Sequence, residues 1–133
     1  MKRINFIAKT ATFDVINNSY VAALSPADGL PGYLMLQRTM EGDPDDDGVY
    51  IEFFQEIASG YDLLSECQIT RNKVRIELRE PFAGIIGIDV SLEIADEPFC
   101  RYIEGVKKVF HGRLGEIIID AQPSDAPRPT AGQ

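Results

Sequence analysis

Apolar and polar residues alternate along most of this chain, which is the pattern of β-strands that bury one face. The alternation is cleanest in two segments, "KVRIELRE" (73–80) and "IDVSLEIA" (88–95). It predicts seven residues that face the core: Val74, Ile76, Leu78, Ile88, Val90, Leu92 and Ile94. The same pattern predicts further strands at 4–15, 19–25, 33–39, 49–57, 62–70 and 113–121. Short segments rich in asparagine, glycine or proline separate them, as turns require.

One segment changes to the period of a helix. In "DEPFCRYIEGVKKVFHG" (96–112) six apolar residues fall on one helical face, namely Phe99, Tyr102, Ile103, Val106, Val109 and Phe110. Asp96 is placed to cap the N-terminus, Pro98 suits the first turn, and Gly112 is the expected stop. The segment therefore predicts an amphipathic helix near the C-terminus.

Together these elements predict an α+β protein that is mostly β. We expect an antiparallel sheet of about six to eight strands, with the helix packed on one face. Residues 1–120 are predicted to form a single domain. Residues 121–133 contain three prolines and no large apolar residue, so they are predicted to be a disordered tail.

Composition narrows the class of function. The chain carries 13 lysines and arginines against 21 acids, a formal net charge of −8, which argues against a nucleic-acid binder. No segment approaches the roughly 20 apolar residues of a membrane span, and the N-terminus lacks the apolar run of a signal peptide. We therefore expect a cytoplasmic protein with no membrane partner. Cys67 and Cys100 are then expected to be reduced thiols.

The stretch "DPDDDG" (43–48) has the spacing of a calcium loop. Asp43, Asp45 and Asp47 match the first ligands of an EF-hand and Gly48 its turn. The required glutamate at the twelfth position is replaced by Phe54, and the flanks are predicted strands where the motif needs helices. A looser calcium site remains open as an alternative, but no metal or other cofactor is predicted.

The same stretch concentrates the charge of the chain. Seven acids and no basic residue lie between positions 41 and 56, so this predicted hairpin carries most of the net charge. Such a surface suits a basic protein partner. The predicted partner-binding residues are Glu41, Asp43, Asp45, Asp46, Asp47 and Glu52. No catalytic residue is predicted, because adjacent aspartates on a loop lack the environment that separates acid from base, and the single histidine, His111, has no predicted catalytic neighbour.

A family resemblance begins at this hairpin. An apolar strand ends in "LQRT" (36–39), an acidic loop follows, and "YIE" (50–52) opens the next strand. This order resembles the immunity protein 10 family of bacterial polymorphic toxin systems. The resemblance extends over about 6–110, through an alternating strand and a closing helix that ends in Val109-Phe110. It implies a cytoplasmic protein that binds and neutralises a cognate toxin and is not an enzyme. A nuclease with a basic groove is a reasonable toxin, since an acidic lobe could occupy that groove.

Two other classes of function stay open. One is a calcium-binding β module that uses the DxDxDG loop, and the other is a small ligand-binding domain with a pocket between sheet and helix. The exposed edges of the predicted sheet could also pair two copies of the chain, so a homodimer is a further expectation.

Overall fold

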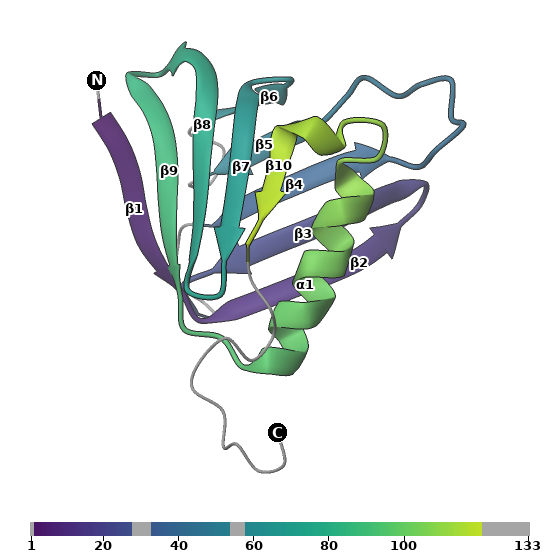
Figure 1. The fold of residues 1–133 in the computed structure, drawn as a ribbon. Helices are drawn as coiled ribbons and strands as arrows, with labels where there is room; N and C mark the ends of the chain where they lie inside the picture. The colour runs from purple at the N-terminus through teal and green to yellow at the C-terminus, as the bar shows by residue number, and fades with distance from the viewer. Residues whose placement is uncertain (1, 28–32, 54–57, 121–133) are drawn as a thin grey trace.

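The computed structural model describes residues 2–27, 33–53 and 58–120, which form two five-stranded sheets and an α-helix (Figure 1). The predicted class, α+β and mostly β, is confirmed. The described strands number ten, in two sheets, where the sequence predicted one sheet of about six to eight strands. The strands of one sheet cross those of the other at a steep angle in Figure 1.

The first sheet, called sheet A, contains two parallel pairings. Its strands in spatial order are β1 (Lys2–Ala8), β9 (Ile85–Leu92), β8 (Lys73–Phe82), β7 (Leu64–Thr70) and β10 (Ile117–Ile119). β1 runs parallel to β9, and β10 runs parallel to β7. The two inner pairings are antiparallel hairpins. Segments far apart in the sequence therefore close both edges of this sheet.

The second sheet, called sheet B, is a meander in which every strand pairs antiparallel with the next. Its strands are β2 (Thr10–Ile16), β3 (Ser19–Ser25), β4 (Leu34–Thr39), β5 (Tyr50–Phe53) and β6 (Ala58–Tyr61). The helix α1 (Asp96–Val109) packs across β2, β3 and β4 on one face of this sheet. A short 3₁₀ turn, η1 (Leu114–Glu116), then leads into β10.

The helix begins and ends close to the predicted positions. All six residues of its predicted apolar face are buried. Pro98 lies in the first turn, and Gly112 adopts a left-handed φ of 72° just beyond the helix. The prediction of Asp96 as the cap is wrong. Ala95 occupies that position without a side-chain bond, and Asp96 instead accepts hydrogen bonds from Arg71.

The strand predicted at 4–15 is in fact two strands that belong to different sheets. Ile4, Phe6 and Ala8 face inward from β1, whereas Ala11 and Phe13 face inward from β2. The inward positions change from even to odd numbers at Lys9, where the chain passes from sheet A to sheet B. A continuous strand would keep one parity, so the split follows from this change of phase.

An apolar core fills the space between the sheets and beneath the helix. All seven residues that the alternation of 73–80 and 88–95 placed inward are buried. Cys67 belongs to this core, Cys100 is half-buried, and both are free thiols. Against the helix, Gly105 lets the ring of Phe13 approach the α1 backbone closely. Core packing thus fixes the helix on sheet B.

Some predictions fall outside the described residues. These are the disordered tail at 121–133, most of the loop at 26–32, and the segment 54–57 with Phe54 and Glu56. Within the described part of the chain, no helix is both long and apolar enough to cross a membrane.

Candidate functional site

The acidic loop, residues 40–49, joins β4 to β5 and is folded by its own hydrogen bonds. The amide of Asp43 donates to the carbonyl of Met40, and the amide of Asp46 donates to the carbonyl of Asp43, both at 3.3 Å. The side chain of Asp43 accepts a bond of 2.8 Å from the amide of Asp45. These are consecutive turns closed by backbone carbonyls and, at Asp43, also by a side-chain carboxylate. The loop therefore has a defined shape.

Arg38 anchors this loop from the inner face of β4. It is the only buried charged side chain in the part of the chain that the structure describes, with 6% of its surface exposed. Its Nε and one terminal nitrogen donate to the two carboxylate oxygens of Asp46, at 2.8 and 2.9 Å. The other terminal nitrogen donates to the carbonyl oxygens of Val109 and His111, at 3.1 and 2.9 Å. One guanidinium thus joins the loop to the C-terminal end of α1, whose carbonyl groups favour a cation.

This contact changes the acidity of Asp46. Its carboxylate also accepts a bond of 2.9 Å from the amide of Gly48. Hydrogen bonding to Arg38 is the main reason that the pKa of Asp46 falls from 3.8 to about 2. Asp46 is therefore ionised and held in place by Arg38 and by the amide of Gly48.

A second anchor holds the other end of the loop. Gly48 has a φ of 99°, and the carboxylate of Asp62 lies so close that a Cβ at this glycine would come within 2.5 Å of its Oδ1. The amide of Asp62 donates to the carbonyl of Val49 at 2.8 Å, and Arg113 donates to the Asp62 carboxylate. Glycine is required here because any side chain would displace this pair.

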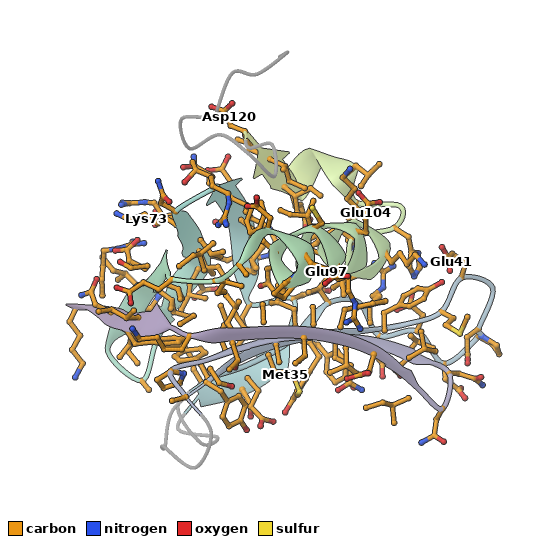
Figure 2. The ribbon with its side chains drawn as sticks, turned by 90° about the horizontal axis from the view of Figure 1, so that it is seen from below. Met35, Glu41, Lys73, Glu97, Glu104 and Asp120 are labelled. Atoms are coloured by element: carbon orange, nitrogen blue, oxygen red, sulfur yellow. The ribbon has the colours of Figure 1, made fainter. Side chains whose placement is uncertain are left out.

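Glu41 lies on the side of sheet B that carries the helix (Figure 2). Its carboxylate accepts a bond of 2.5 Å from the hydroxyl of Tyr20, whose ring is buried against the edge of His111. That hydrogen bond is the main reason that the pKa of Glu41 is lowered, and Lys108 and His111 act in the same direction. The imidazole of His111 lies 2.8 Å from the carbonyl of Thr39, so its Nε2 carries the proton in this contact.

Glu52 lies on the opposite face of sheet B. It stands beside Met35 in the register of β4 and β5, and Figure 2 shows Met35 pointing away from α1. The hydroxyl groups of Tyr33 and Tyr50 both donate to its carboxylate, the latter at 2.6 Å. Glu41 and Glu52 therefore do not share a surface.

The six predicted contact acids thus have different environments. Asp45 and Asp47 are exposed at the tip and Asp43 is half-exposed beside them, whereas Asp46 is tied to Arg38. Sequence reasoning missed Arg38, Tyr20, Asp62 and Arg113 as supports of the loop. Arg38 did leave a signal, since it follows Leu34 and Leu36 at an inward-facing position, where a cation requires a buried acceptor.

A metal site needs several ligands that converge on one point. Among residues 2–27, 33–53 and 58–120, no group of three or more histidine, cysteine or acidic side chains converges to hold a metal ion. Both carboxylate oxygens of Asp46 accept from Arg38, and one oxygen of Asp43 accepts from the loop backbone. The loop uses its acids to shape itself as well as to present charge.

In the described residues, fold and site together define two β-sheets, one packed helix and an acidic loop that Arg38 holds in place. Comparison of the sequence with models of known protein families and with curated proteins finds no match.

Proposed function

We propose that this protein is an immunity protein that binds and neutralises a cognate toxin of a bacterial polymorphic toxin system. The order "LQRT", acidic loop, "YIE" supports the family, and the braced loop supports the mode of action. The observation that carries the proposal is the contact of Arg38 with Asp46 and with the end of α1, which presents Asp43, Asp45 and Asp47 on a pre-shaped loop. Pre-shaping lowers the entropy cost of binding.

The partner that suits such a loop is a protein with a basic surface. Exposed carboxylates attract cations over about 8 Å at physiological salt, so they act mainly on the rate of association. A nuclease has a basic groove for the phosphates of its substrate, and the loop tip would occupy that groove. The protein would then act by stoichiometric binding in the cytoplasm of the producing cell, without chemistry of its own.

The proposed function implies a large reading frame with a C-terminal toxin domain beside this gene, and the test uses that toxin domain as the binding partner. We expect tight binding by calorimetry, with association that slows as salt is raised. The triple variant D43N/D45N/D47N should bind the toxin domain more weakly by more than about 1 kcal/mol. It removes three contact charges and leaves the ion pair between Arg38 and Asp46 in place. An unchanged affinity would exclude the loop as the contact surface. Failure of the wild-type protein to bind or inhibit the domain would contradict the function itself.

The matched control removes the same charge elsewhere. Glu80, Glu97 and Glu104 are exposed and lie on β8 and α1, outside the acidic loop. The triple variant E80Q/E97Q/E104Q should bind like the wild type at physiological salt. Equal losses in the two triple variants would indicate a general charge effect rather than a contact.

A further inference from the structure

The face of sheet B that points away from α1 has an orderly composition. Cross-strand register places its side chains in two adjacent rows. One row is Asp14, Val21, Gln37, Tyr50 and Tyr61, and the other is Thr12, Ala23, Met35, Glu52 and Ser59. We call these two rows the tyrosine face. Their neighbours in sequence, such as Leu36 and Ile51, point to the core and are fully buried.

One end of the tyrosine face is built from aromatic rings around a carboxylate. Tyr33 and Tyr50 both donate hydrogen bonds to Glu52, which fixes the orientation of their rings. The rings of Tyr50 and Tyr61 lie 5.2 Å apart, and Tyr61 is 52% exposed. Tyrosine offers a large contact area with few rotatable bonds, which is why it is enriched at binding hot spots.

The charge of this face has one sign. Within the two rows, which consist entirely of described residues, there are two acids, Asp14 and Glu52, and no lysine or arginine. The outer face of sheet A differs, because Arg3 and Arg75 lie on it beside Glu77 and Asp89. The row with Gln37 and Tyr50 also leads directly into the acidic loop, since β4 and β5 are the strands which that loop joins.

We infer that the tyrosine face is the second half of the toxin-binding surface and that it receives an arginine of the partner between Tyr50, Tyr61 and Glu52. This inference rests on the proposed function. A guanidinium stacks on tyrosine rings through its flat face while its N–H groups point at a carboxylate, a combination that lysine cannot reproduce. A basic partner that reaches both the loop tip and this face meets acids at both places and no lysine or arginine within the two rows.

Affinity for the toxin domain provides the first test. Tyr61→Ala and Glu52→Gln should each weaken binding about tenfold or more, as expected for the centre of an interface. The controls lie on the outer face of sheet A: Ile118→Ala removes a side chain that is 45% exposed, and Glu66→Gln neutralises a half-exposed strand glutamate. Both control variants should bind like the wild type. Loss of binding in D43N/D45N/D47N with full binding in Tyr61→Ala and Glu52→Gln would overturn this inference while leaving the proposed function intact.

A second measurement needs no toxin. An arginine hexapeptide, titrated into the labelled protein and followed by NMR, should shift the resonances of Tyr50, Tyr61 and Glu52. A citrulline hexapeptide, which lacks the charge, should shift them far less. Shifts confined to residues 43–47 would overturn the inference even if no toxin domain bound the protein. Failure of this inference can therefore be distinguished from failure of the proposed function.

Discussion

At the scale of single residues, Arg38 has the most consequential contacts in the described part of the chain. It is buried, it is charged, and each of its partners belongs to the loop or to the end of the helix. A buried cation is tolerated only when its donors are matched, and breaking such a set leaves a desolvated charge. The shape of the acidic loop thus depends on one side chain from the preceding strand.

The ion pair between Arg38 and Asp46 predicts how the stability of the protein depends on pH. The pKa of Asp46 is about 2 in the folded protein and about 3.8 when exposed, a difference worth roughly 2 kcal/mol. This stability is fully present above about pH 5 and is lost as pH falls toward 2, because the folded carboxyl has the lower pKa. Asp46→Asn should therefore reduce the free energy of unfolding at pH 7 by about 2 kcal/mol, and the gap to the wild type should close at low pH.

Denaturant unfolding at several pH values measures this effect. The control is Asp47→Asn, which neutralises the next residue at the exposed tip and should change stability by less than about 0.5 kcal/mol. A gap between wild type and Asp46→Asn that stays constant from pH 7 to pH 2 would contradict the assignment of the pKa shift to the Arg38 contact.

Substitution of Tyr102, unlike that of Asp46, is not expected to lower the free energy of unfolding. Its ring is buried in the core, and its hydroxyl has no hydrogen-bond partner within the described residues. Burial raises the pKa of this phenol and also raises that of Cys67 to about 12, so both groups are neutral at pH 7. Tyr102→Phe should leave the free energy of unfolding unchanged or raise it by up to about 1 kcal/mol, because it removes a polar atom that folding desolvates. A loss beyond about 1 kcal/mol in denaturant unfolding would reveal a partner for the hydroxyl.

At the scale of elements, the contact between α1 and β2 is unusually close. A methyl group at Gly105 would lie 2.9 Å from the Cβ of Phe13 and closer still to its ring, so rotation of the phenylalanine could not make room. Gly105→Ala should therefore destabilise the fold by about 1–3 kcal/mol, because the clash outweighs the higher helix propensity of alanine. Thermal unfolding measures the loss.

Two variants test whether contact with Phe13 causes this loss of stability. Gly115→Ala places a methyl group where nothing lies within 4 Å and should be nearly neutral. Phe13→Ala in the Gly105→Ala background removes the ring atoms that would lie closest to the new methyl group, so the two substitutions should be strongly non-additive. Simple additivity would show that Phe13 is not the obstacle.

The period of the apolar residues predicted some elements of this fold and could not predict others. The helix and the strands around the Arg71-Asn72 turn were predicted because each shows its period within a few residues of sequence. The partition into two sheets was not predicted, since the parallel partners of β1 and β10 lie far away in the chain and alternation carries no record of them. The acids of the loop were found by composition, but the selection of Asp46 by Arg38 depends on loop geometry that no spacing encodes.

At the scale of the whole molecule, Arg3 keeps the N-terminal strand in place. Its guanidinium crosses Gly87 and binds Asp89 at 2.7 Å and Glu77 at 2.9 Å. It thereby links β1 to the adjacent β9 and to β8 beyond it, and its hydrogen bonds with Asp89 lower the pKa of that carboxyl. Arg3→Met should loosen β1 and speed amide exchange at residues 4–8 about tenfold, corresponding to about 1.4 kcal/mol.

Hydrogen exchange followed by mass spectrometry measures this change. Lys9→Met is the control, because it removes only the exposed contact with Glu93 at the end of the same strand. Equal acceleration in the two variants, or acceleration spread evenly over both sheets, would show that Arg3 does not act on β1 locally.

The pairing of β1 with β9 also has a consequence for synthesis on the ribosome. Sheet B is a run of neighbouring hairpins from Thr10 to Tyr61 and can begin to pair as soon as those residues emerge. β1 emerges before sheet B but has no partner in its own sheet until Ile85–Leu92 has been made. β1 is thus paired later than the strands of sheet B, and it stays an open strand while the residues between β1 and β9 are made.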